Sequence, residues 1–242
     1  MKTAIVTGSS KGIGLALSKR LLNLGYRVYG LARSFDKKDP EHPEYYPVIQ
    51  DLLDTEGLEK TIKNILDREP HVHLLVNNAG GGFFGPHEQI RVRDIQYMVR
   101  LNLEVPLILS RLLLRPLKES RGTLLFVASA TAKKASPHGC AYAATKAGLS
   151  HFAASLFEEA RKAGVKVTTL YPDMTQSSFY DNQDFTCDPD PEAYINPDQV
   201  ADAMEYVLGS GDNLSVGEVV LRPQINRIKR KAKGWHLEAP PG

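Results

Sequence analysis

The sequence has little of several features that mark specialised classes of protein. Only two of its 242 residues are cysteines, too few for a disulfide framework and typical of a reducing compartment. Basic residues total 30 and acidic residues 28, so the net charge of +2 lacks the excess of a dedicated nucleic-acid or membrane-surface protein. No apolar run reaches the roughly 18–20 residues needed to span a bilayer. We also find no internal repeat and no linker that divides the chain.

Hydrophobic residues, at 42%, are sufficient for a full core and exclude a disordered chain. A length of 242 residues favours one domain. The chain enters a strand-like segment at Thr3, which leaves no room for a signal peptide, so we expect a cytoplasmic protein.

Strand-like segments alternate with helical patterns along the whole chain. The segment 72–77 is almost wholly apolar, as is typical of strands buried on both faces of a parallel sheet. The alternation predicts a single doubly wound parallel sheet of the α/β class (Rossmann-like), with helices on both faces. Pro106 predicts a kink in the third helix. The predicted strands are 3–7, 27–31, 48–50, 72–77, 123–129, 165–171 and 216–221, and the predicted helices are 13–24, 56–68, 94–118, 140–163 and 198–208.

A glycine-rich connection joins the first strand to the first helix. Gly8 permits a tight turn, Gly12 lets the backbone approach a pyrophosphate, and Gly14 lets the helix pack closely on the strand. The helix N-terminus offers unpaired N–H groups and the positive end of its dipole to an anion. A flexible turn is the alternative, but the context favours a dinucleotide site. Its candidate residues are Gly8, Ser10, Lys11, Gly12, Ile13 and Gly14.

The spacing Gly-x-x-x-Gly-x-Gly, with Thr7 in front, resembles the short-chain dehydrogenase/reductase family. The resemblance extends along nearly the whole chain. Asn77-Asn78-Ala79-Gly80, at the end of the fourth strand, is similar to the family's Asn-Asn-Ala-Gly signature. Its catalytic set is matched in order and spacing by Asn102, Ser129, Tyr142 and Lys146. The resemblance implies an enzyme that moves hydride between a nicotinamide cofactor and a carbonyl or alcohol.

Tyr142 and Lys146 are four residues apart on a predicted helix, so their side chains share a face. A phenol has an ordinary pKa near 10, and a neighbouring ammonium lowers it toward the range of a general acid/base. Tyr142 would exchange a proton with the reacting oxygen, and Ser129 would hydrogen-bond the same oxygen. The resemblance implies that Lys146 also holds the nicotinamide ribose and that Asn102 helps to position a proton relay.

The end of the second strand favours NADP(H) over NAD(H). An acid about 20 residues beyond the glycines usually binds the ribose of NAD, but here no acid occurs before Asp36. Arg33 instead supplies a planar guanidinium suited to a 2′-phosphate, and Lys11 supplies a second cation. The alternative is that Asp36 reaches the ribose. We also expect Asp51 and Leu52 at the adenine, and Asn78, Ala79 and Gly80 at the ribose.

The sequence departs from the family pattern after the sixth strand. Pro172 is followed by Asp173, where the family usually has glycine, and the fifth position after the proline is Ser177 rather than threonine. We expect the nicotinamide carboxamide to contact Pro172, the backbone around Thr175 and the Ser177 hydroxyl. Asp173 puts the local backbone geometry in doubt.

Two segments lack a clear period. Residues 175–197 carry aromatic, acidic and proline residues at the position of the family's substrate lid, so we expect a mobile lid and an apolar or aromatic substrate. The alternative is that the aromatic residues anchor the loop. Residues 227–242 are interpreted as a basic, solvated C-terminal tail, which leaves 1–226 as the catalytic domain.

The pair His71-x-His73 has no apparent third ligand, so we expect no metal site and a structural role for His73. Cys140 and His138 lie near the predicted pocket edge, where Cys140 is expected to serve packing. The hypothesis is an NADP(H)-dependent oxidoreductase that acts on a small carbonyl or alcohol, forms a homodimer or homotetramer, and has neither a nucleic-acid nor a membrane partner. The alternative is a non-catalytic NADP(H)-binding sensor or regulatory protein on the same fold.

Overall fold

Seven parallel strands form a central sheet in the order β3-β2-β1-β4-β5-β6-β8. The structure is a computed structural model that describes residues 1–35 and 40–231; Asp36 lies outside this range. The predicted doubly wound sheet is confirmed, with some strand ends shifted by two or three residues. The strands are β1 Lys2–Thr7, β2 Tyr26–Ala32, β3 Tyr45–Ile49, β4 Leu74–Asn77, β5 Thr123–Val127, β6 Lys166–Pro172 and β8 Glu218–Leu221.

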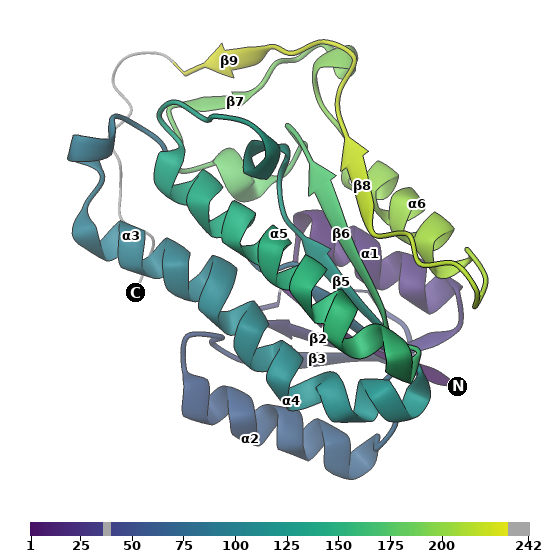
Figure 1. Cartoon of the computed structure of the whole chain (residues 1–242). Helices are drawn as coiled ribbons and strands as arrows, with labels where there is room; N and C mark the ends of the chain where they lie inside the picture. Colours follow the sequence, from purple (N-terminus) through teal and green to yellow (C-terminus); the bar gives the residue numbers. More distant parts are fainter. Residues whose placement is uncertain (36–39, 232–242) are drawn as a thin grey trace.

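Helices cover both faces of the sheet (Figure 1). One apolar cluster joins the sheet to α2, α4 and α5 around residues such as Phe126, and a second joins it to α1 and α6 around Leu17 and Met204. Among the described helices, none is long and apolar enough to cross a bilayer. The helices are α1 Gly12–Asn23, α2 Thr55–Arg68, α3 Val92–Val99, α4 Val105–Ser120, α5 Cys140–Ala160 and α6 Pro197–Leu208.

The long helix predicted at 94–118 is interrupted by a π-helical turn, Arg100–Glu104, between α3 and α4. Pro106 lies in the first turn of α4, where a missing N–H is tolerated. The π-helical turn ends at Glu104, two residues before the proline at which the sequence predicts a kink. π-Helical turns occur frequently at functional sites, and this one contains Asn102.

The order of the strands reverses beside β1, which pairs with β2 on one side and with β4 on the other. The connections that leave β1 and β4 run to opposite sides of this point. A crevice therefore opens at the carboxyl ends of these strands, where doubly wound sheets bind ligands.

The segment between β6 and α6 contains more secondary structure than its sequence predicts. It contains a short strand, β7 Phe185–Cys187, which pairs antiparallel with β9 Ile228–Arg230 (Figure 1). The Arg227 guanidinium lies 2.9 Å from a carboxylate oxygen of Asp188 and 2.8 Å from one of Asp190.

The described part of the basic run is thus not a free solvated tail. The Lys231 ammonium donates to the carbonyl oxygens of Tyr180 (2.9 Å) and Asp181 (2.8 Å), and Arg230 pairs with Asp184. We call residues 225–231 the strap. The β7 and β9 strands have three residues each, which is too short for a hydrophobic period to be seen in the sequence. The acidic partners of the strap lie some 40 residues away, so the local charge pattern could not reveal the salt bridges either.

We predict that Arg227→Ala weakens the strap without unfolding the domain. Loss of these two exposed salt bridges should raise amide exchange in β7 by about twofold to fivefold, because such pairs add only modestly to local stability. Hydrogen exchange followed by mass spectrometry measures this. Arg161→Ala, which removes a surface pair with Glu158 on another element, should leave β7 unchanged. Equal exchange in the wild type and Arg227→Ala would show that the strand pairing alone holds this segment.

Candidate active site

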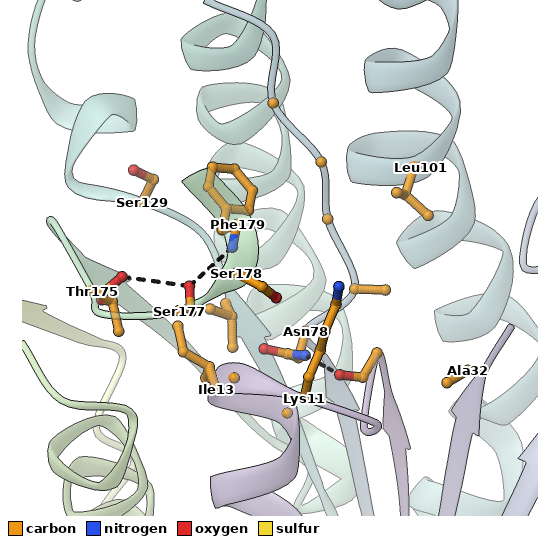
Figure 2. Close-up of a pocket in the computed structure, with 18 of the residues that line it drawn as sticks. Lys11, Ile13, Ala32, Asn78, Leu101, Ser129, Thr175, Ser177, Ser178 and Phe179 are labelled. Atoms are coloured by element: carbon orange, nitrogen blue, oxygen red, sulfur yellow. Dashed lines mark hydrogen bonds between the residues drawn. The ribbon is translucent and has the colours of Figure 1, made fainter. Parts of the chain in front are cut away.

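A cavity of about 400 Å³ opens at the carboxyl ends of the central strands. We call the glycine-rich connection 8–14 the phosphate loop. Figure 2 shows Ser177 and Phe179 on one side of the cavity, with Ser177 near Ile13 of this loop. Lys11 extends from the same loop into the cleft (Figure 2). Of the predicted cofactor and catalytic residues, all except Asn102 line this cavity: Gly8, Ser10, Lys11, Gly12, Ile13, Gly14, Arg33, Asp51, Leu52, Asn78, Ala79, Gly80, Ser129, Tyr142, Lys146, Pro172, Thr175 and Ser177.

The phosphate loop has room for little besides glycine. Gly8 and Gly12 adopt φ values of +65° and +56°, in the left-handed region. A Cβ on Gly14 would lie 2.1 Å from the carbonyl oxygen of Gly8. The first turn of α1 has no acidic residue, and Lys11 at its N-cap makes no side-chain cap, so the leading amides stay available to an anion. The loop therefore fits a pyrophosphate.

Thr7 and Asn78 join the phosphate loop to the end of β4. The Thr7 hydroxyl accepts from the amides of Asn78 and Ala79, each at 3.0 Å. The Asn78 side chain donates to the carbonyl oxygens of Thr7 (2.8 Å) and Gly8 (3.2 Å). These bonds hold the predicted pyrophosphate and ribose segments in one frame.

Asn102 is fully buried and binds the backbone that forms the cavity wall. Its side chain accepts from the Gly81 amide (2.9 Å), donates to the Gly81 carbonyl (2.8 Å), and donates to the Thr145 hydroxyl (3.1 Å). Thr145 in turn donates to the carbonyl of Tyr142 at 2.7 Å. The π-helical turn thus connects the segment after β4 to α5 beside Tyr142.

Tyr142, Lys146 and Ser129 converge at one end of the cavity. Lys146 is 3% exposed and donates to the carbonyl of Val127, the last residue of β5, at 2.9 Å. Its ammonium lies 5.9 Å from the centre of the Tyr142 ring. The Ser129 hydroxyl accepts from the Thr131 amide (3.2 Å) and the Thr131 hydroxyl (3.0 Å), so its own hydrogen remains for Tyr142 or a ligand.

Burial is the main cause of the pKa shifts of Tyr142 and Lys146, the two titratable side chains of α5 at this end of the cavity. Desolvation raises the pKa of Tyr142 to about 12, although the hydrogen bond from Ser129 acts in the opposite direction. Desolvation also lowers the pKa of Lys146 to about 8. The expected net lowering of the tyrosine pKa is thus wrong for the unliganded protein, because the ammonium faces Val127 and burial disfavours the phenolate.

The cations expected at a 2′-phosphate lie at the edge of the cavity. Arg33 is exposed at the end of β2, and Lys11 is exposed at the phosphate loop. Tyr97 on α3 lies within the electrostatic range of Arg33 and Asp51, and it packs against Gly81, where a Cβ would lie 2.7 Å from its ring. No sequence pattern marked Tyr97 as a residue of this site.

Asp173 fits the chain after β6 without unusual backbone. Its amide donates to the Leu221 carbonyl at 3.0 Å, and its carboxylate accepts from the Met174 amide (3.0 Å) and pairs with Lys134 (3.5 Å). Among the described residues other than glycine, only Arg121 and His138 have positive φ. The doubt raised by a side chain at position 173 is thereby removed.

The weaker sequence signals lie outside this cavity. The Nδ1 atom of His73 accepts from the Thr3 amide at 3.1 Å, which supports the expected structural role. Cys140 is exposed and lines a separate shallow groove. His138 adopts φ +61°, and its carbonyl accepts from the Gly85 amide at 2.7 Å.

The two phenylalanines that follow the glycine run 80–82 also belong to the site, although the sequence patterns did not predict them. Phe83 lines the cavity, and the ring of Phe84 lies 5.1 Å from that of Tyr142. Gln183 is buried and donates to the Gly82 carbonyl at 2.8 Å. In the sequence, the only indication of these contacts is the run of three glycines before two phenylalanines. Such a run lets the rings pack closely against the backbone.

Comparison with known proteins agrees with this geometry. An uncharacterized oxidoreductase of Staphylococcus epidermidis is 28% identical over 227 residues, covering 92% of this chain and 97% of the relative. A serine 3-dehydrogenase of Rhizobium radiobacter is 27% identical, covering 91% and 93%. The structure of an alcohol dehydrogenase from Thermococcus sibiricus, complexed with 5-hydroxy-NADP, is similar with a TM-score of 0.83 at 25% identity, covering 94% and 98%.

The family described as short chain dehydrogenase matches residues 2–186. This match spans the phosphate loop, the segment after β4, and the residues Ser129, Tyr142 and Lys146 that the fold brings together. The chain belongs to the short-chain dehydrogenase/reductase family of oxidoreductases.

Proposed function

We propose that the protein is an NADP(H)-dependent oxidoreductase that transfers hydride between the nicotinamide and a carbonyl/alcohol pair. The observation that carries this proposal is the convergence of Tyr142, Ser129 and Lys146 at one end of the cavity that the phosphate loop opens. The left-handed backbone at Gly8 and Gly12 and the uncapped first turn of α1 further support a dinucleotide pyrophosphate at this end of the cavity.

Each part of the cavity then has a separate task. The backbone from Gly8 to Gly14 would hold the pyrophosphate, and Arg33 with Lys11 would hold the 2′-phosphate. The adenine would lie at Asp51 and Leu52, the ribose at Asn78, Ala79, Gly80 and Lys146, and the nicotinamide carboxamide at Pro172, Thr175 and Ser177.

When bound, NADPH supplies the hydride, and this chain supplies the proton and the charge. Because burial keeps the Tyr142 phenol protonated at neutral pH, Tyr142 can give its proton to a carbonyl oxygen. The Ser129 hydroxyl donates to the same oxygen as negative charge develops on it. Lys146, on the same face of α5, stabilises the phenolate that remains.

The names of similar proteins suggest the first substrates to test. The relatives include a serine 3-dehydrogenase, and the similar structures include an alcohol dehydrogenase. Screening should therefore include L-serine and simple alcohols with NADP⁺, and a range of aldehydes and ketones with NADPH. Turnover would also separate an enzyme from a sensor on the same fold.

We predict that Tyr142→Phe lowers kcat by about 10²–10⁴-fold, the usual loss for a general acid/base. The NADPH dissociation constant should stay near the wild-type value, because the ring is retained. Steady-state kinetics and fluorescence titration measure the two quantities. Tyr206→Phe, on the exposed face of α6, is the matched control. Near-normal turnover of Tyr142→Phe would exclude the assigned role.

We predict that NADPH binds more tightly than NADH by about 10–200-fold, the range for one charge-assisted contact of about 1.5–3 kcal/mol. Arg33→Ala should remove most of this preference, and Lys11→Ala a smaller part. Fluorescence titration with both cofactors tests it, with Arg115→Ala as a surface control. Tighter binding of NADH by the wild type would show that another group reads the ribose.

We predict that burial of the Lys146 ammonium lowers the free energy of unfolding at neutral pH. Its pKa is lower in the folded chain (about 8) than the ordinary 10.5, so the folded protein binds the proton less well. The penalty, on the order of 3 kcal/mol, is present below pH 8 and disappears as the pH rises toward 10.5.

Lys146→Met removes this titration, but it also leaves the Val127 carbonyl without its donor at every pH. The pH dependence is therefore the informative quantity. Urea unfolding at pH 7 and pH 10 should show the wild type gaining about 2–3 kcal/mol relative to Lys146→Met. Lys162→Met controls for loss of a surface lysine. A difference that does not change with pH would mean that the ammonium is not buried in the folded protein.

A further inference from the structure

Four aromatic rings gather beside the catalytic tyrosine. Phe84 follows β4, whereas Phe179, Tyr180 and Phe185 belong to the segment between β6 and α6. The Tyr142 ring lies 5.1 Å from Phe84 and 5.8 Å from Phe179, measured between ring centres. We call Phe84, Phe179, Tyr180 and Phe185 the aromatic wall. Phe179 and Tyr180 line the cavity, whereas Phe84 and Phe185 pack against these two rings and support them.

The wall is a connected set rather than a chance cluster. Phe84 contacts Phe179 at 6.4 Å and Phe185 at 5.4 Å, and in both pairs the rings are nearly perpendicular. Tyr180 contacts Phe179 at 5.1 Å and Phe185 at 5.4 Å. Edge-to-face pairs of this kind stabilise a defined arrangement of rings.

The backbone around the wall is shaped to admit the rings. A Cβ on Gly82 would lie 2.7 Å from the Phe84 ring and 2.9 Å from the Phe179 ring, and a Cβ on Gly139 would lie 3.1 Å from Phe84. The buried Gln183 side chain ties the two segments together through the Gly82 carbonyl. The strap adds a second restraint, because Lys231 donates to the Tyr180 carbonyl.

Lys231 donates to the backbone of Tyr180 but does not line the cavity, so the charges that a substrate would meet are those of the described cavity lining. The basic residues that line the cavity there are Lys11, Arg33 and Lys146. Lys11 and Arg33 lie at the phosphate loop and at the end of β2, and Lys146 donates to Val127. No basic side chain of the described cavity lining is therefore placed to neutralise a substrate carboxylate beside Phe84 and Phe179, and burying an unpaired charge there is costly.

The acidic residues of the cavity lining likewise offer no partner for a charged substrate at the wall. Among the described residues, the carboxylates that line the cavity are Asp51 and Asp173. Asp173 is already engaged by Lys134 and by the Met174 amide. A substrate cation would therefore find aromatic rings but no free carboxylate of the cavity lining beside them.

We propose that the aromatic wall recognises a flat, uncharged apolar group, such as an aryl ring, attached to the reacting carbonyl carbon. The inference rests on the proposed function and names the substrate class of the same site. In the reaction, the carbonyl carbon gains hydride from NADPH and its oxygen gains the Tyr142 proton. The carbonyl is reduced to an alcohol, NADPH is oxidised to NADP⁺, and solvent returns the proton to the tyrosine.

The test compares aldehydes that differ in one property, with NADPH oxidation followed by absorbance. 4-Methylbenzaldehyde should have a kcat/KM at least about tenfold above that of 4-carboxybenzaldehyde and of 4-(trimethylammonio)benzaldehyde, because each charge loses its hydration in the site. The kcat/KM for 4-methylbenzaldehyde should exceed that for propanal by a similar factor, because the short chain of propanal does not reach the rings of the wall. The ammonium compound also tests whether the rings prefer a cation.

Variants of the wall show whether the preference originates there. Phe179→Ala and Phe84→Ala should raise KM for 4-methylbenzaldehyde by about 10–100-fold and reduce its advantage over propanal. Phe179→Leu should retain more of the preference, since it conserves apolar volume. The NADPH dissociation constant should not change in any of these variants. Tyr206→Ala, which removes an exposed ring from α6, should behave as the wild type.

Failure of this inference can be distinguished from failure of the proposed function. If NADPH binds and propanal or a charged aldehyde is reduced as well as 4-methylbenzaldehyde, the oxidoreductase assignment stands and the wall does not select substrates. A preference for the ammonium compound would likewise overturn the inference, in favour of a cation site. If the wild type reduces no carbonyl compound while Tyr142 and Lys146 are intact, the proposed function itself fails.

Discussion

The buried ammonium of Lys146 is the constraint on which the site depends. It lies 2.9 Å from the carbonyl oxygen of Val127, where β5 ends, and it projects from the middle of a well-packed helix. A cation in this place has lost most of its hydration, and a single carbonyl does not replace it. The surrounding fold must therefore hold α5 firmly against the sheet, which it does through Leu149, Ala153 and Leu156 in the core.

The position of α5 against the sheet also fixes the other residues of the site. Tyr142 lies one turn before Lys146 and is held by Thr145, whose hydroxyl links it to Asn102 and so to Gly81. The segment after β4 is thereby fixed between the phosphate loop on one side and the catalytic helix on the other. Its glycines let it lie close to both, and the two phenylalanines that follow carry its end to the aromatic wall.

Much of this could be predicted from the sequence because it depends on local pattern. The glycine spacing required a close contact between α1 and β1, and the Gly14 environment shows that contact. The four-residue spacing of Tyr142 and Lys146 placed both on one face of α5. The candidate cofactor residues followed the ends of successive strands, and parallel strands bring such ends together.

What the sequence could not show depends on contacts between distant segments. The strap pairs with β7 through three residues on each strand, and its arginines find acids about 40 residues earlier in the chain. The aromatic wall joins Phe84 to rings about 100 residues later. The direction of the Tyr142 pKa shift required the depth of burial, which residue spacing does not contain.

In the proposed reaction Tyr142 is the acid/base group, and its pKa is set by its buried surroundings and by the cofactor. The direct test is the titration of the Tyr142 phenol, followed by NMR of ¹³C-labelled tyrosine with Tyr142→Phe to assign the signal. Without cofactor the account predicts a pKa well above the ordinary 10, near 12. With NADP⁺ bound, the positive nicotinamide should lower that pKa by at least about one unit. A Tyr142 pKa that is the same with and without NADP⁺ would contradict the account.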